Sequence, residues 1–357
     1  MPHALLQPLV WAVCLSCLIC LVLVATQRWH GRFTHDVLHG VQKFHENPTP
    51  RVGGLGIMLG LAVAAWKLEG HLEGAGASVL RSLLIAGLPA FLFGLADDLG
   101  ISENAWARLM ATLASGVLAW AVGGALLVRV GVPVLDALLQ WMPLAVAFTA
   151  FALAGLANAF NIIDGFNGQS SGVVILILLA LATIAWQVGD VELAAVALII
   201  TSAVAGFMLV NYPLGKIFLG DGGAYLLGFS AGCLAVLLLQ RNAGVSPWAL
   251  LLVVVYPVWE VAFSMLRRRR QGRALMRPDS LHLHTLLQRR RTRWLLQRRT
   301  AVWQNAAVAP MVWGLCAAAC AWGVWSHANS TASIAGLCVF IATYTLVYRR
   351  LVRFRWG

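Results

Sequence analysis

Residues 171–188 read SGVVILILLALATIAWQV, a stretch without a single charged side chain. As a helix, a stretch of this length and composition is long enough to cross the apolar part of a bilayer. Because alternating ten-residue strands do not produce unbroken apolar stretches, a membrane β-barrel is excluded. The chain contains eleven mostly apolar candidate spans, of which the second and third are short or flanked by charge, and is predicted to be an all-α polytopic membrane protein. The spans are 4–26, 52–66, 79–96, 107–128, 137–157, 171–188, 191–210, 223–240, 247–266, 305–325 and 331–348.

The composition excludes most soluble classes of protein. Of the 357 residues 60% are apolar and 11% are charged, and the mean hydropathy is +0.79, whereas a soluble domain is typically about 45–50% apolar and about 25% charged. A soluble enzyme, a disordered chain and a small disulfide scaffold are therefore excluded. No internal repeat or sizeable soluble segment is visible, so residues 1–357 are expected to form one membrane domain. The first apolar stretch lacks a small-residue cleavage pattern and is expected to be an anchor rather than a signal peptide.

The net charge of +12 is distributed unevenly along the chain. If the N-terminus faces outward, 22 of the 26 Lys and Arg residues lie in inward loops, and twelve of them are arginines of the loop at 267–304. This asymmetry predicts a periplasmic N-terminus and a cytoplasmic C-terminus. The basicity then reflects topology rather than a nucleic-acid partner, and Arg267–Arg270 are expected to be membrane anchors. Some arginines could also serve an anionic substrate or lipid.

The seven cysteines all lie in predicted spans. Cys14, Cys17 and Cys20 have the spacing of iron–sulfur ligands but lack the fourth cysteine that such runs carry. They are therefore expected to be small apolar packing residues, and no disulfide framework is predicted.

Two inward loops contain residues suited to phosphate or a cation. In the first, Pro48-Thr49-Pro50-Arg51 precedes Gly53 and Gly54 at the start of a helix, an arrangement that suits phosphate but also a rigid turn with close helix packing. In the second, Asp97 and Asp98 repel each other unless a cation or a proton compensates. They could hold Mg²⁺, position a nucleophile, take a proton, or simply end a span in solvent.

Two further inward loops contain oxygen ligands. Asn158, Asn161 and Asp164 recur every three residues, so a helical end places them on one face. Amide and carboxylate oxygens suit Mg²⁺ rather than zinc. Asp221 stands between glycines just before an apolar helix, where it could bind a metal while free backbone N–H groups bind phosphate, or act as a helix cap. Together these loops predict a site for a doubly phosphorylated, Mg²⁺-bound substrate, and its place at the bilayer edge suggests a lipid as the second substrate.

The last inward loop adds His282 and His284 beside several arginines. A histidine pair could bind zinc, but the loop holds neither an H-E-x-x-H pattern nor a cysteine. An anionic ligand therefore suits it better.

Five motifs, in this order and over roughly residues 40–290, resemble the polyprenyl-phosphate N-acetylhexosamine-1-phosphate transferases. They are Pro48-Thr49-Pro50-Arg51-x-Gly53-Gly54, Asp97-Asp98, Asn158-x-x-Asn161-x-x-Asp164-Gly165, Phe218-x-Gly220-Asp221 and His282-x-His284. The eleven predicted spans resemble the branch that starts O-antigen, enterobacterial common antigen or teichoic-acid linkage synthesis.

The resemblance implies a multi-pass enzyme of the bacterial inner membrane with a cytoplasmic active site. In it, undecaprenyl phosphate attacks the β-phosphorus of a UDP-N-acetylhexosamine and UMP leaves. Asn161 and Asp221 are the implied Mg²⁺ ligands, and Asp97 and Asp98 are the implied catalytic residues near the lipid phosphate. A homodimer is compatible with this assignment. The implied substrate contacts are Lys43, Arg51, Asn158, Asp164, Asn167, Arg277, His282 and His284.

The chain departs from the family pattern at two positions. Asn167 stands where bacterial members usually have a second Asp, and Thr285 where they have a third His. The sugar therefore stays open among N-acetylglucosamine, N-acetylgalactosamine and a 6-deoxy-N-acetylhexosamine. Two other classes are also weighed. A transporter or flippase of lipid-linked sugar should show buried charge in mid-span, which the spans are expected to lack; a catalytically silent scaffold would not need the retained acidic residues.

Overall fold

The computed structural model describes residues 2–36, 48–69, 75–102, 104–272 and 281–352. Within these ranges the chain is helical, and the only β pairing is an isolated bridge between His35 and Pro50. Each of the eleven apolar stretches predicted from the sequence is helical over most of its length. The helices are α1 (Pro2–Ala25), α2 (Gln27–Thr34), α3 (Gly53–Glu69), α4 (Ala75–Asp98), α5 (Ala105–Gly123), α6 (Pro133–Leu138), α7 (Met142–Ile163), α8 (Gln169–Gln187), α9 (Val191–Asn211), α10 (Gly220–Arg241), α11 (Pro247–Val253), α12 (Val255–Arg270), α13 (Leu283–Leu287), a π-helical turn (Gln288–Thr292), α14 (Arg293–Leu295), α15 (Ala301–Ala306), α16 (Val308–Trp325) and α17 (Ser330–Val352).

The number of helices able to cross a membrane is lower than predicted. Nine helical stretches of the described residues are long and apolar enough, and a tenth is obtained if α11 and α12, bent by 79° at their junction, form one broken span. The apolar part of α3, Gly53–Leu68, is shorter. The count of eleven is therefore not confirmed, and the sides on which the termini lie stay a prediction.

Local chemistry explains where the helix boundaries differ from the predicted ones. α5 ends at Gly123 rather than near residue 128, because Gly124 adopts a left-handed conformation with a φ of 69° that terminates the helix. α7 begins only at Met142, with Pro143 in its first turn. The bend between α11 and α12 precedes Pro257, whose missing N–H removes a hydrogen bond to the preceding turn.

α10 is the centre of the bundle and packs against α3, α4, α7 and α8. Of the residues in an 18-residue window of this helix, 94% are buried. The backbone of its first turn packs directly against the backbones of α3 and α4. A Cβ added at Gly94 of α4 would lie 2.5 Å from the backbone nitrogen of Gly222, and one added at Gly54 of α3 would lie 2.5 Å from that of Gly223. Close approach of α3 and α4 to the start of α10 positions the acidic residues described below.

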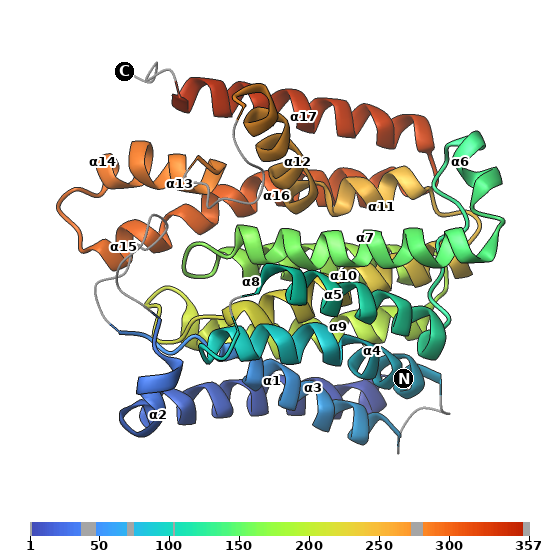
Figure 1. Cartoon of the computed structure of the whole chain (residues 1–357). Coiled ribbons are helices and arrows are strands. Elements are labelled where there is room, and N and C mark those ends of the chain that lie inside the picture. Colours follow the sequence, from blue (N-terminus) through green and yellow to red (C-terminus); the bar gives the residue numbers. More distant parts are fainter. Residues whose placement is uncertain (1, 37–47, 70–74, 103, 273–280, 353–357) are drawn as a thin grey trace.

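Figure 1 shows the long helices lying side by side, with α2, α14 and α15 at one end of the bundle and α6 at the other. One expectation about the spans is wrong: α12 contains a fully buried acidic residue, Glu260, which is 1% exposed. A single glutamate within an apolar stretch of the sequence was its only signal.

Candidate functional site

Backbone hydrogen bonds join the first and the fourth sequence motifs. The Phe218 N–H donates to the Pro50 carbonyl (2.8 Å), and the N–H groups of Gly53 and Gly54 donate to the carbonyls of Phe218 and Leu219 (both 2.9 Å). The segment before α3 therefore runs beside the segment before α10. This pairing brings Arg51 to Asp221, 170 residues away in the chain.

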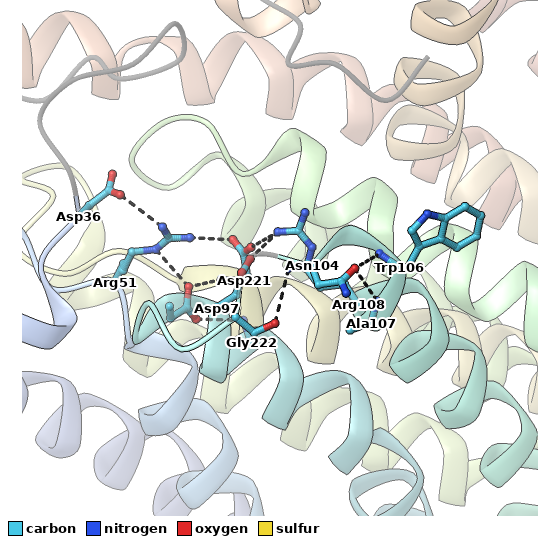
Figure 2. Close-up of polar contacts among 11 residues, drawn as sticks. Asp36, Arg51, Asp97, Asn104, Trp106, Ala107, Arg108, Asp221 and Gly222 are labelled. Carbon is cyan, nitrogen blue, oxygen red and sulfur yellow. Dashed lines mark hydrogen bonds and ion pairs between the residues drawn. The ribbon is translucent and has the colours of Figure 1, made fainter. Parts of the chain in front are cut away.

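The Arg51 guanidinium bridges three carboxylates, as Figure 2 shows. Its Nη2 donates to Asp221 Oδ1 at 2.9 Å, its Nε to Asp98 Oδ1 at 3.1 Å and its Nη1 to Asp36 Oδ1 at 3.4 Å. The planar fork of arginine suits such multiple contacts. Arg51 is therefore held at the centre of the acidic cluster, and Asp36, which the sequence analysis did not single out, belongs to it.

Asp98 is a buried anchor between α4 and α10. Its side chain is 1% exposed, and it accepts hydrogen bonds from the backbone N–H groups of Asp221 (2.8 Å) and Gly222 (3.0 Å) as well as from Arg51. Its carboxylate thus satisfies N–H groups that the first turn of α10 leaves unpaired. Gly220 passes so close, with a φ of 78°, that a Cβ there would lie 2.4 Å from Asp98 Oδ2.

Asp97 faces a different partner from Asp98. Its Oδ2 accepts a hydrogen bond from Nη1 of Arg108 in the first turn of α5, and the same Nη1 lies 3.7 Å from Asp221 Oδ2. Asp221 is therefore flanked by two arginines, Arg51 and Arg108, as Figure 2 shows. From the sequence, Arg108 could be used only to assign topology, because a single arginine near a span end is indistinguishable from an anchor.

The third motif ends α7 close to this cluster. Asn158 Nδ2 donates to Thr112 Oγ1 of α5 (3.2 Å) and to the Ala154 carbonyl (2.8 Å), so it ties α7 to α5. Asn161 makes no side-chain hydrogen bond to the part of the chain that the structure describes. Burial, reinforced by the negative charge of Asp221, raises the pKa of Asp164 to about 7.

Asn167 and Asn211 join the loop after α7 to the loop before α10. Asn167 Nδ2 donates to the Pro213 carbonyl (3.0 Å). Asn211 accepts from the Gly168 N–H and donates to the Ile217 carbonyl, both at 2.7 Å. Asn167 was predicted to contact substrate, and its amide donates within the protein. Asn211 was not singled out, because one asparagine at the end of an apolar helix gives no distinctive pattern.

The two histidines lie against the third motif. The ring of His284 is 5.7 Å from that of Phe166 and stacks on His282 at 5.3 Å. A Cβ added at Gly165 would lie 3.0 Å from His284 Nε2, so this loop and the histidines touch. Lys43 and Arg277, both predicted substrate contacts, lie outside the described residues.

Arg267 does more than anchor the protein in the membrane. Its Nη1 donates to the Leu281 carbonyl at 2.6 Å and also to the hydroxyl of Tyr348 in α17. It therefore supports the backbone next to His282. Arg267–Arg270 were predicted to be membrane anchors separate from the histidine loop, and Arg267 does not fit that prediction. Arg268 is buried, at 9% exposed.

The donor atoms at the cluster fit a hard cation by their chemistry. Asp221 and Asp97 supply carboxylate oxygens to the cluster, a ligand type that Mg²⁺ prefers, and the side chain of Asn161, in the last turn of α7, carries an amide oxygen of the same hard type. Over the residues that the structure describes, no three His, Cys, Asp or Glu side chains form a metal-binding group by themselves. Any cation would therefore need an amide, water or substrate oxygens in addition to Asp221, as is usual for Mg²⁺.

The fold and the cluster define a multi-pass membrane protein with an Arg- and Asp-lined polar site at one end of its helix bundle. Residues 80–239 match the model of glycosyl transferase family 4. This match supports the resemblance on which the sequence motifs were interpreted.

The chain is similar to several curated proteins. It is 25% identical over 245 residues (68% of this chain, 66% of the relative) to a probable undecaprenyl-phosphate N-acetylglucosaminyl 1-phosphate transferase of Bacillus subtilis. It is 28% identical over 257 residues (70% and 68%) to an undecaprenyl-phosphate alpha-N-acetylglucosaminyl 1-phosphate transferase of Yersinia pestis, and 29% identical over 269 residues (67% and 65%) to a decaprenyl-phosphate N-acetylglucosaminephosphotransferase of Mycobacterium tuberculosis. The chain thus spans about two thirds of the length of these relatives.

Proposed function

We propose that this protein transfers an N-acetylhexosamine 1-phosphate group from a UDP-sugar to undecaprenyl phosphate and so starts a lipid-linked cell-envelope polysaccharide of O-antigen type. The observation that carries the proposal is the convergence of Asp97, Asp98 and Asp221 with Arg51 and Arg108 at one end of an apolar bundle. The names of the relatives support a prenyl-phosphate acceptor. The site would face the cytoplasm, where nucleotide sugars are found.

The reaction balances as a phosphoryl transfer. An oxygen of the lipid phosphate forms a bond to the β-phosphorus of the donor, the bond from that phosphorus to the oxygen bridging the two phosphates breaks, and UMP leaves with that oxygen. Positioning and charge stabilisation dominate such reactions. Arg51 and Arg108 bring two fixed positive charges to the place where both substrates would carry negative charge.

The acidic residues have distinct proposed roles. Asp97 orients the lipid phosphate or takes a proton from it. The oxygens of Asp98 already accept three hydrogen bonds. We therefore propose that Asp98 holds Arg51 and the start of α10 in place, rather than accepting a proton from the lipid phosphate. Asp164 and the histidine loop hold the nucleotide and the diphosphate sugar.

A magnesium ion is part of the proposal. Asn161 and Asp221 would hold it, and it would neutralise charge on the diphosphate of the donor. Because Asp221 contacts two arginines, binding of a cation would leave these arginines available to the phosphates of the substrates.

The buried charge of Glu260 does not favour a transporter. Glu260 contacts His282, the Leu283 N–H and Tyr344, so it is paired within the protein. Its contacts are those of a structural charge with fixed partners.

The test uses the full-length protein in detergent with undecaprenyl phosphate, MgCl₂ and, separately, UDP-N-acetylglucosamine, UDP-N-acetylgalactosamine and a UDP-6-deoxy-N-acetylhexosamine. Release of UMP that needs both lipid and donor supports the proposal, and the preferred donor identifies the sugar. Asp221→Asn is the matched inactive control. Full UMP release by this variant, or with a chelator present, would contradict the role of Asp221.

A further inference from the structure

Glu260 is a buried charge with three partners. The side chain is 1% exposed and lies in α12, just beyond the 79° bend. Its Oε1 lies 3.1 Å from His282 Nδ1 and accepts the Leu283 N–H at 3.0 Å, and its Oε2 accepts the Tyr344 hydroxyl at 2.8 Å. A carboxylate is costly to bury unless it is fully paired, and within a membrane protein it indicates function.

The contacts determine which nitrogen of His282 carries a proton. The Leu283 N–H can only donate, and an ionised carboxylate can only accept. Nδ1 of His282 must therefore donate to Glu260, which leaves Nε2 as the nitrogen directed at other groups. A carboxylate that holds one ring nitrogen is the usual means of fixing a histidine tautomer and ring orientation.

The same contacts reach the proposed active site through His284. His282 and His284 stack with an interplanar angle of 12°, and His284 touches Gly165 and Phe166, next to Asp164. On the other side, Arg267 and Tyr348 both donate to the Leu281 carbonyl, at 2.6 and 3.1 Å. α17 thus contacts the backbone before His282 directly through Tyr348 and, by way of Glu260, reaches His282 through Tyr344.

We infer that Glu260, with Tyr344, is a positioning residue that sets the tautomer and orientation of His282 and, through it, the placement of His284 beside the Asp164 loop. This inference rests on the proposed function, since the histidines matter there as contacts of the donor. It assigns a role in the reaction to α12 and α17, which lie outside the residues matched by the family model.

Epistasis between Glu260 and His282 tests the inference. If Glu260 acts through His282, Glu260→Ala should lower kcat/KM by at least about tenfold, and the double variant with His282→Ala should be no worse than His282→Ala alone, within about twofold. Independent roles would multiply the two losses, and that result would overturn the inference. Glu260→Gln, which keeps the volume and an acceptor oxygen, should retain more activity than Glu260→Ala. Ser333→Ala, which removes a buried hydroxyl elsewhere in α17, should leave activity unchanged.

A spectroscopic measurement separates this inference from the proposed function. In protein labelled with ¹⁵N-histidine, the signal missing from His282→Ala belongs to His282. We expect it to report a protonated Nδ1 in the wild type and to shift in Glu260→Gln and Glu260→Ala. An unchanged signal in both variants would overturn the inference whether or not the protein turns over, whereas shifted signals in a protein that transfers no sugar would count against the proposed function alone.

Discussion

Asp97 and Asp98 are adjacent in the sequence, but we predict that their substitutions differ in their effect on stability. Asp98→Ala should destabilise the protein strongly and Asp97→Ala much less, although both should lower turnover. Asp98→Ala leaves two backbone N–H groups of α10 and the Nε of Arg51 without their acceptor. Breaking a buried, hydrogen-bonded charge pair typically costs about 3–5 kcal/mol. Asp97 is paired with Arg108, whose side chain is 29% exposed, and it also lies beside the like charge of Asp221, so Asp97→Ala should cost less stability than Asp98→Ala.

Both substitutions should lower turnover, for different reasons. Asp97→Ala removes the group that orients the lipid phosphate or accepts its proton, and should lower turnover roughly 10²–10⁴-fold. Asp98→Ala should lower turnover by displacing Arg51 and the start of α10. Asp98→Asn keeps one acceptor oxygen and should recover part of the lost stability.

The assay is a denaturant titration of detergent-solubilised protein, run beside UMP release for each variant. Thr183→Val, which changes a hydroxyl on an exposed part of α8, is a control for handling. Equal stability of Asp97→Ala and Asp98→Ala would refute the reasoning, because it would mean that the buried contacts of Asp98 contribute nothing.

Three further predictions concern charge and loop contacts. The pKa of Asp164 is raised to about 7, so its ionisation lowers the stability of the folded protein as the pH rises from about 4 to 7. Asp164→Asn, measured by thermal unfolding with a chelator present, should therefore stabilise the protein at pH 8 by on the order of 1–4 kcal/mol. At pH 4 the same substitution should not stabilise it. Arg108→Gln should raise the KM for undecaprenyl phosphate or lower kcat while leaving stability nearly unchanged; a fall in stability equal to that of Asp98→Ala would contradict this. Asn211→Ala should destabilise the protein by about 1–3 kcal/mol by removing both its buried contacts; unchanged unfolding would refute it.

The helical membrane fold and the clustering of polar motifs could be predicted from the sequence. Long apolar stretches have one stable form in a bilayer, and charge asymmetry assigned the acidic motifs to one side. The structure joins Arg51 to Asp221 and Asp98 as that assignment requires.

The partners of single charged residues could not be predicted. Arg108 and Glu260 each stand alone in or beside an apolar stretch, and Arg267 is the first of four consecutive arginines. At each of these positions an anchor, an ion pair and a loop support look alike in the sequence. Their roles depend on contacts with residues such as Tyr348, 81 positions from Arg267. Short helices such as α2 and α6 were also missed, because they carry no long apolar pattern.

The central claim is that the donor's sugar phosphate passes to the lipid at the Arg51–Asp221 cluster. The most direct measurement uses a UDP-sugar labelled in its β-phosphate, with undecaprenyl phosphate and Mg²⁺, and follows the label by mass spectrometry of the extracted lipid. We predict a lipid-linked diphosphate sugar carrying the label with the wild type and none with Asp221→Asn. Label that stays in the nucleotide with every N-acetylhexosamine donor, in wild-type protein that is folded and reconstituted in a bilayer, would contradict the account.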